Sequence, residues 1–453
     1  MLTFADWLRY YNNLDVGPFI EALDIMKAFY GERGIDICKD AVSLPGVALQ
    51  CLLRGTAENK LYAPSKKAYD HLKAAISGGP SIVFTRYHEA GVTSIRSHQY
   101  AALKPCKRVL DYDANALHLS TMLKDMPCGK EEVTDYEDPV NAVPLIQKAV
   151  LSEKLFGFVK CKLTTPRHLW PKFEEMPPLF VNREVPEAAV PQEMLEYLIQ
   201  TGRKRTAVKK LLGVFEADDI LLYTPLLQWY LEHGLELKAV YTTIEYRPEK
   251  CLAWFVNQVT EPHRMGDADK EKAILAEVFK LLGKSSYGKM IEAFERHNNA
   301  SYTKDETTVD RALRSAWFED LTEMGTAYEI TSRKPRVTIH RAFYVGIAVC
   351  QLAKLRTLEF YHDILDRFVD GQDFELIQMD TDSLYFALAG FKLHEVVKPE
   401  LQTEFEKCKK DWLAWDTFSN RTPGLFKLEF EGHQAIVHCS KCYFVDGDEK
   451  SKH

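Results

Sequence analysis

The chain has 453 residues, of which 46% are hydrophobic and 27% charged, with a formal net charge of −7. This composition is typical of a globular protein of about three structural units, and it excludes a disordered, collagen-like or disulfide-stapled chain. No apolar run approaches the roughly 18 residues that span a bilayer, and no secretory signal is evident. We therefore expect an intracellular protein with reduced cysteines and no membrane partner. The acidic balance means that any contact with nucleic acid must come from local basic patches.

The first segment with a chemical pattern spans residues 108–122. Polar and apolar residues alternate up to Asp113, which predicts a strand, and helical character begins at Ala114. Asp111 and Asp113 lie on the same side of this strand. A strand that ends in a carboxylate and turns into a helix is suited to hold a metal ion beside a phosphate.

The second segment, residues 269–290, has apolar residues at helical spacing, with Asp267 or Asp269 as the expected N-cap. Three residues share one stripe of this helix, and they are Lys280, Lys284 and Tyr287. On one face of a helix, two ammonium groups could bind a triphosphate and an aromatic ring could stack on a base. A single pair of lysines at this spacing is more often part of an ordinary amphipathic helix, whose lysines extend their charged ends into water.

The third segment places Asp380-Thr-Asp-Ser383 between two apolar, β-rich runs, which predicts a tight hairpin. Alternation along a strand puts Asp380 and Asp382 on the same side. Adjacent carboxylates repel each other unless a cation lies between them, and hard oxygen ligands suit Mg²⁺ or Mn²⁺.

In this order, the three segments resemble the polymerase motifs of family B DNA polymerases. The branch they resemble is the protein-primed one of viruses, linear organellar plasmids and Polinton (Maverick) transposons. The segment from Asp113 is similar to D-x-x-S-L-Y-P, residues 280–288 to K-x-x-x-N-S-x-Y-G, and residues 380–383 to D-T-D-S. The ordered set is a far stronger signal than any of its members.

Weaker similarities extend over most of the chain. Residues 11–15 resemble the third exonuclease motif, and residues 76–79 a strand-binding Y-x-G-G link. Residues 350–354 resemble the template-contacting T-x-x-A-R, and residues 441–443 the primer-holding K-x-Y. The DNA-binding residues implied by these elements are Gly78, Gly79, Lys354, Lys441 and Tyr443.

The resemblance implies template-directed transfer of deoxynucleotides from dNTPs to a primer 3′-hydroxyl, with two Mg²⁺ or Mn²⁺ ions between Asp113 and Asp382. Asp380 is then a supporting catalytic residue, and Asp111 is the rival of Asp113. The implied nucleotide contacts are Ala114, Asn115, Leu117, His118, Lys280, Lys284 and Tyr287. Primer-template DNA is the implied partner, together with a terminal priming protein by analogy.

The chain also departs from the family pattern. The first two exonuclease motifs are missing, so we expect no proofreading, and too few residues follow Tyr443 to build a thumb. His118 replaces a family Tyr, and Lys284 replaces a family Asn. These departures suit a truncated or domesticated copy, or a partial gene model. They keep open the alternative of a catalytically inactive, transposon-derived DNA-binding protein.

The fold class implied is α+β, a polymerase palm made of an antiparallel sheet backed by helices, with inserted helical fingers. The expected division is 1–75 exonuclease remnant and linker, 76–124 first part of the palm, 125–255 an insertion resembling the first terminal-protein region, 256–291 fingers, 292–338 second insertion, and 339–453 second part of the palm.

Two further classes are weighed against this interpretation. A zinc-binding module would use His433, His438, Cys439 and Cys442, but the chain has a single C-x-x-C. A reverse transcriptase is disfavoured, because its hairpin would end in two adjacent aspartates.

Overall fold

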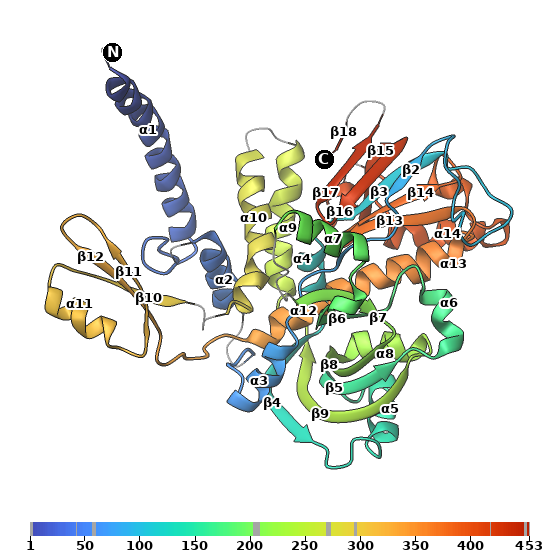
Figure 1. Cartoon of the computed structure of the whole chain (residues 1–453), viewed down its shortest axis with the longest axis horizontal. Helices are drawn as coiled ribbons and strands as arrows, with labels where there is room; N and C mark the ends of the chain where they lie inside the picture. The colour runs from blue at the N-terminus through green and yellow to red at the C-terminus, as the bar shows by residue number, and fades with distance from the viewer. Residues whose placement is uncertain are drawn as a thin grey trace.

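The fold mixes helices with antiparallel sheets (Figure 1). It was obtained as a computed structural model. The residues that the structure describes are 3–41, 43–56, 60–202, 209–268, 273–293, 297–416, 418–447 and 451–452, with the side chains of 15, 262–268 and 273–275 left out.

A five-stranded antiparallel sheet forms the centre of one half of the molecule. Its strand order is β1-β13-β14-β3-β15. The strands are β1 (Ser81–Val83), β3 (Arg108–Ala114), β13 (Phe374–Asp380), β14 (Ser383–Leu388) and β15 (Phe426–Gly432). The predicted strand before Asp113 and the predicted hairpin around Asp380 are therefore confirmed.

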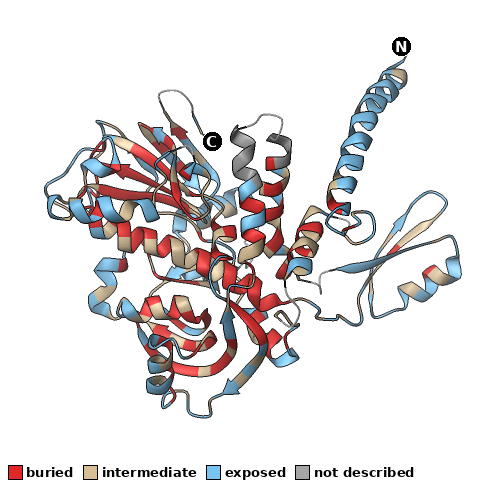
Figure 2. Cartoon of the chain, turned by 180° about the vertical axis from the view of Figure 1, so that it is seen from behind, coloured by how far each residue is buried: buried red, intermediate tan, exposed pale blue. Residues whose placement is uncertain are grey.

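One face of this sheet packs on α12 (Phe343–Glu359), which continues through a π-helical turn (Phe360–Leu365) into α13 (Asp366–Phe368). Phe360 stacks on Phe426 of β15 with ring centroids 3.8 Å apart. Each such buried aromatic side chain contributes about 1.5–3 kcal/mol by leaving water. Figure 2 shows the resulting continuous buried layer. This packing fixes where the turn ends of β3 and β14 lie.

A smaller sheet of order β18-β17-β16-β2 lies beside the large one. Its strands are β2 (Tyr87–Glu89), β16 (Gln434–Cys439), β17 (Cys442–Asp446) and β18 (Ser451–Lys452). Helix α14 (Gln402–Cys408) lies in the connection before β15.

Residues 125–255 form a second layer around a four-stranded sheet of order β4-β9-β5-β8. The strands are β4 (Met126–Asp135), β5 (Gly157–Thr164), β8 (Glu216–Tyr223) and β9 (Glu236–Glu249). A hairpin of β6 (Leu179–Glu184) and β7 (Lys209–Val214) lies above it. The helices of this region are α5 (Val143–Leu151), α6 (Trp170–Phe173), α7 (Gln192–Gln200) and α8 (Thr224–Glu232).

Two helices stand upright beside the five-stranded sheet, α9 (Ala253–Ala268) and α10 (Ala273–Met290), and they pack on each other and on α2 (Leu44–Gly55) (Figure 1). The predicted helix thus begins at Ala273. Asp267 is not its N-cap, because that residue still belongs to α9, while Asp269 lies outside the described residues.

Two parts extend away from the body. Helix α1 (Phe4–Gly31) projects alone and is almost entirely exposed (Figures 1 and 2). A lobe, residues 297–333, consists of β10 (Asn298–Thr303), α11 (Glu306–Leu313), β11 (Phe318–Glu323) and β12 (Tyr328–Arg333). Helix α3 (Lys66–Ala74) lies at the base of the body. In the described part of the chain, every helix is too short or too polar to cross a membrane.

Candidate active site

The turn between β13 and β14 brings two carboxylates together. Ser383 pairs in register with Asp113, and its Oγ donates a hydrogen bond to Asp113 Oδ1 at 2.9 Å. The carbonyl of Asp382 accepts from the amide of Ala114 at 2.9 Å. Asp113 and Asp382 therefore lie close together where the neighbouring strands β3 and β14 meet the turn, although 269 positions separate them in the sequence. The first and third segments are therefore neighbouring strands of one sheet, while the metal ions expected between Asp113 and Asp382 stay a prediction.

The turn is held in place by the segment of residues 75–80, which connects α3 to β1 and is called the linker below. Thr381 has a φ of +61°, which is uncommon for a β-branched residue. Its amide donates to the carbonyl of Pro80 at 2.8 Å. A Cβ on Gly79 would lie 2.5 Å from the Thr381 side chain, so only glycine permits this close approach. The linker thus helps to fix the position of Asp382.

Both carboxylates lie in an environment that favours a cation. Burial and, to a smaller extent, the neighbouring charge of Asp113 together raise the pKa of Asp382 to about 6, while Lys284 acts in the opposite direction. Burial also raises the pKa of Asp113, against the hydrogen bond from Ser383. A divalent ion would relieve this repulsion. Among the described residues, no group of three or more His, Cys, Asp or Glu side chains is arranged to hold a metal ion.

The neighbouring aspartates have other partners. Asp380 forms an ion pair with Lys441, with 2.5 Å between Oδ2 and Nζ. Strand alternation ends at Asp380, so the period-two argument does not set the direction of Asp382, which lies in the turn. Asp111 is fully buried, and its Oδ2 lies 2.8 Å from Nζ of Lys452. Burial raises the pKa of Asp111 to about 6, although Lys452 acts to lower it.

The predicted helix after β3 starts later than expected. Ala114 remains in the strand, paired with Phe426, and α4 (Leu117–Thr121) begins only after Ala116, which has a left-handed φ of +41°. The amide of Asn115 donates to the carbonyl of Leu425 at 2.9 Å. The amides of Ala114 and Asn115 are therefore already used within the protein.

Two predicted nucleotide contacts meet across different elements. The imidazole of His118 on α4 stacks on the ring of Tyr287 on α10, with centroids 4.4 Å apart and an interplanar angle of 3°. Burial lowers the pKa of His118 to about 4, so the imidazole is neutral at pH 7. Leu117 points into the main core instead. Lys280 forms an ion pair with Glu277 on its own helix, with Nζ and Oε1 3.0 Å apart.

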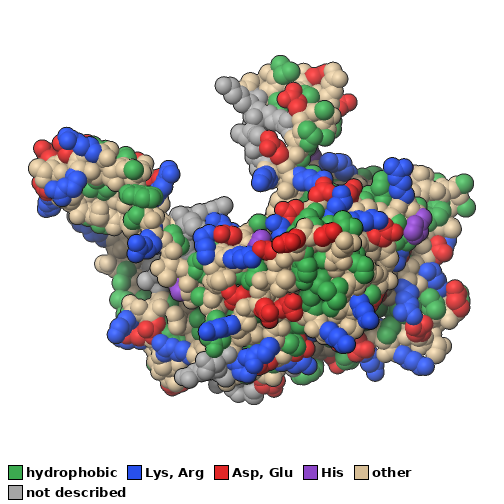
Figure 3. All heavy atoms as spheres, turned by 90° about the horizontal axis from the view of Figure 1, so that it is seen from below, with side chains coloured by type: hydrophobic (Ala, Val, Ile, Leu, Met, Phe, Trp, Pro, Cys, Tyr) green, Lys and Arg blue, Asp and Glu red, His purple; other side chains and the backbone are tan. Residues whose placement is uncertain are grey.

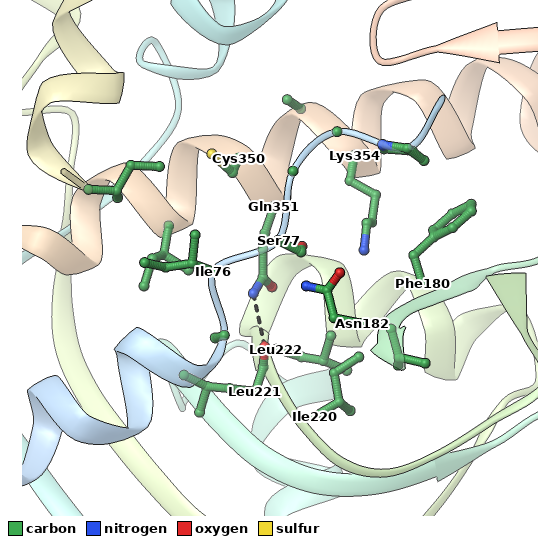
Figure 4. A pocket seen from close by; sticks show the side chains of 18 of the residues that line it. Ile76, Ser77, Phe180, Asn182, Ile220, Leu221, Leu222, Cys350, Gln351 and Lys354 are labelled. Carbon is green, nitrogen blue, oxygen red and sulfur yellow. Dashed lines mark hydrogen bonds between the residues drawn. The ribbon is translucent and has the colours of Figure 1, made fainter. Parts of the chain in front are cut away.

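The predicted DNA contacts fall in two places. Gly78, Gly79 and Lys354 line a cavity of about 200 Å³ between the linker, α12 and β8. The ammonium of Lys354 points into this cavity beside Asn182 and lies 5.1 Å from the centroid of Phe180 (Figure 4). Among the described residues it has no hydrogen bond or ion pair, and burial lowers its pKa to about 8.

The second place is the hairpin of β16 and β17, which carries Lys441 and Tyr443. Lys441 reaches Asp380, and the hydroxyl of Tyr443 lies 3.2 Å from that of Tyr385, which is opposite Asp111 in register. Acidic and basic side chains are interspersed on the face shown in Figure 3, in keeping with the net charge of −7.

Other predicted sites lie elsewhere. Tyr11 is exposed on α1, far from the turn (Figure 1), and the side chain of Asp15 is outside the described set. In the zinc alternative, His433 lies 3.6 Å from Asp446, while Cys439 and Cys442 are exposed. Among the described residues these side chains do not form a metal-binding cluster.

Sequence reasoning missed the partners that hold the site. Lys452, Glu429 and Pro80 each contact the site from a distant part of the chain. Asp111 lies between apolar residues in a predicted strand, which indicates that its carboxylate needs a nearby cation. Nothing in the sequence identifies Lys452 as that cation.

The comparisons with known proteins agree with the fold. No protein-family model matches the sequence, and no curated protein sequence matches it significantly. Phi29 DNA polymerase in a ternary complex with primer-template DNA and incoming nucleotides matches with a TM-score of 0.54 and 13% identity, covering 91% of this chain and 60% of that one. The binary complex with primer-template DNA matches at 0.51 and 14%, covering 91% and 57%.

The chain thus spans less than two thirds of the length of these polymerase chains. At such low identity, the likeness shows that the chain has a fold similar to that of Phi29 DNA polymerase.

Proposed function

We propose that this chain carries out template-directed DNA synthesis, transferring deoxynucleotides from dNTPs to a primer 3′-hydroxyl. The observation that carries the proposal is the meeting of Asp113 and Asp382 at the turn edge of the sheet, beside the stacked rings of His118 and Tyr287. Three separate segments of the chain supply these side chains, since Asp113 and His118 are only five residues apart. Likeness to structures of Phi29 DNA polymerase in complex with primer-template DNA supports the same conclusion.

Asp113 and Asp382 would hold two Mg²⁺ or Mn²⁺ ions, which when bound supply charge to the attacking oxygen and the triphosphate. The carboxylates fit these ions because burial and mutual repulsion favour a nearby cation. Mg²⁺ is commonly bound by one or two carboxylates together with substrate phosphates and water, so two protein ligands suffice. Asp380 adds a small negative potential at Asp382, and its ion pair with Lys441 limits this effect.

The incoming nucleotide would lie between these carboxylates and α10. Lys284 already acts on the charge of Asp382, so it is placed to neutralise a triphosphate there. Lys280, one turn earlier on α10, would exchange its pairing with Glu277 for a phosphate. The stacked rings of His118 and Tyr287 would contact the sugar and the base.

The two DNA strands would approach from different sides of the turn. Lys354 is half-buried in the cavity beneath Gly78 and Gly79 and has no ion pair among the described residues, which suits a phosphate of the template strand. Lys441 and Tyr443 lie next to Asp380 and Tyr385, which suits the primer end.

In the terms of the family, the five-stranded sheet with α12 would be the palm, and α9 with α10 the fingers. Residues 125–255 and 292–338 would be the two insertions of protein-primed relatives, and a terminal protein would supply the priming hydroxyl. We also propose that the chain lacks proofreading. A relationship to transposon polymerases stays a prediction.

Primer extension by the purified chain tests the proposal. A labelled primer-template with dNTPs and Mg²⁺ should be extended, and Asp113→Asn should remove extension. Asp310→Asn, an exposed aspartate on α11, is the matched control. DNA binding with no extension under any condition would instead support the inactive DNA-binding alternative.

A further inference from the structure

Two cysteines that are distant in sequence lie in direct contact below the upright helix pair. Cys128 is near the start of β4, and Cys251 lies in the turn between β9 and α9. Their sulfur atoms are 2.9 Å apart, closer than the roughly 3.5–4.0 Å at which non-bonded heavy atoms usually rest. A disulfide bond of about 2.05 Å would require an approach of about 0.9 Å. Pairing of β4 with β9 holds the two segments in this position.

The two thiols differ in access and in acidity. Cys128 is fully buried, whereas Cys251 is partly exposed. The thiol of Cys128 donates a hydrogen bond to Sγ of Cys251, which lowers the pKa of Cys251 against the effect of its burial. The same interaction raises the pKa of Cys128. Glu249 raises the pKa of Cys251, and Lys60, which pairs with Glu249 beside this site, lowers it to a smaller extent.

This arrangement has the parts of a reactive dithiol. The more exposed sulfur carries the stabilised thiolate, which is the attacking species in thiol–disulfide exchange. The buried partner lies within reach to complete the reaction. Cys439 and Cys442 are close to each other in sequence, but both are exposed. They have no sulfur–sulfur contact among the described interactions.

We propose that Cys128 and Cys251 are a site of reversible disulfide formation, with Cys251 as the attacking thiol and Cys128 as the resolving one. A low-molecular-weight disulfide such as oxidised glutathione is the oxidant. The Cys251 thiolate attacks one glutathione sulfur, forms a mixed disulfide and releases one glutathione. Cys128 then loses its proton and attacks Sγ of Cys251, which releases the second glutathione. The two protein thiols are oxidised, and one glutathione disulfide is reduced to two thiols.

The bond would have a definite mechanical effect. Leu252 and α9 follow Cys251 directly, so a bridge to β4 would fasten the entry of the α9–α10 pair to the four-stranded sheet. The bridge closes a loop of more than a hundred residues, which restricts the unfolded chain strongly. The main thermal transition should therefore rise by several degrees on oxidation. This inference does not depend on the proposed polymerase activity.

Peptide mapping of the oxidised full-length chain under non-reducing conditions is the test. After incubation with oxidised glutathione, we expect a peptide pair linked through Cys128 and Cys251 that disappears with dithiothreitol. The Cys128→Ser variant should instead retain a stable glutathione adduct on Cys251. Cys38→Ser, at an exposed cysteine, is the control and should form the bridge like the wild type.

Two outcomes would overturn the proposal. One is a wild-type chain in which both cysteines stay free while other cysteines become linked. The other is a glutathione adduct on Cys251 that persists in the wild type as long as in Cys128→Ser. An unchanged melting temperature in material whose bridge is confirmed by mapping would overturn the expected mechanical effect of the bond. If Cys128→Ser does not fold, Cys251→Ser serves, since the proposal predicts that its Cys128 gains no adduct.

Discussion

His118 and Tyr287 lie face to face, so a residue that follows the first carboxylate strand is packed directly on the helix that carries Lys280 and Lys284. The contact couples α4 to α10. Because burial keeps the imidazole neutral, the stack involves two uncharged rings. Any change at His118 therefore also changes the surface that Tyr287 presents.

The first prediction concerns sugar choice. An imidazole is shorter than a phenol, and its nitrogens can bond a 2′-hydroxyl, which contributes about 1 kcal/mol in favour of ribonucleotides. His118→Tyr should raise the preference for deoxynucleotides by about one to two orders of magnitude. The measurement is the ratio of kcat/KM for dNTPs and rNTPs in both forms. An unchanged ratio would assign sugar selection to another residue, and Tyr287→Phe, which keeps the stack, is the control.

The second prediction concerns the carboxylates. Asp113→Asn or Asp382→Asn should reduce extension by about 10³-fold or more, because each removes a metal ligand. Without metal, Asp382→Asn should stabilise the fold by about 1–2 kcal/mol, since it ends the repulsion that raises the pKa of this group. Urea unfolding and single-turnover extension provide the two readouts. Asp111→Asn should retain most of the extension rate, and a greater loss than in Asp113→Asn would place the metal at Asp111.

The third prediction concerns the ion pair of Asp111 and Lys452. Lys452→Met leaves a buried carboxylate without its cation and should destabilise the chain by about 3 kcal/mol. The folded pKa of Asp111, about 6, is above its unfolded value, so its folded form binds more protons and stability falls as pH rises through that window. Loss of Lys452 raises this pKa further, so the destabilisation should be larger at pH 8 than at pH 5.

Urea titrations at both pH values measure this difference. The double variant Asp111→Asn with Lys452→Met should recover most of the stability at pH 8, because no charge is then left buried. A double variant as unstable as Lys452→Met alone would show that the lysine acts through packing.

The fourth prediction concerns Lys354. Lys354→Met should weaken binding of primer-template DNA at low salt and reduce the slope of log K against log salt by about one, as expected for one lost phosphate contact. Because it removes a half-buried charge with no described ion pair, its free energy of unfolding should be unchanged or higher. Fluorescence anisotropy over a salt series is the measurement, with Lys148→Met, at an exposed lysine of α5, as the control. An unaltered salt slope would remove Lys354 from the DNA interface.

The fifth prediction is that the chain does not shorten a mispaired primer end. Two residues of one exposed helix, Tyr11 and Asp15, do not provide the carboxylates that two-metal hydrolysis requires. A labelled mispaired primer with Mg²⁺ and without nucleotides should remain intact. Shortening that is lost in Asp15→Ala would contradict this.

The sequence predicted local elements better than their partners. The strand before Asp113 and the hairpin at Asp380 follow from alternation and turn chemistry, which are local. The start of the helix after Asp113 was predicted less accurately, because it was expected at Ala114 and lies at Leu117. Ala114 keeps strand pairing with Phe426, a residue more than 300 positions away, and no local pattern reports that pairing.

The candidate site shows the same limit. The motifs placed Asp113, Asp382 and Tyr287 in a common neighbourhood, but the stack on His118 and the lysine under Asp111 depend on tertiary packing. The contact of Gly79 with Thr381 could not be predicted either. Two adjacent glycines indicate a flexible or closely approached backbone, but they do not identify the residue that approaches it.

The lobe of residues 297–333 has a consequence for the way the molecule comes apart. Among its described residues, only Val309 and Ile330 are buried, which is a very small core for three strands and a helix. Such a unit opens at a free energy well below that of the rest. Proteases should therefore cut there first, while the five-stranded sheet remains folded, and heat should release the lobe before the main transition. A single melting temperature would then describe the body of the chain and not the whole of it.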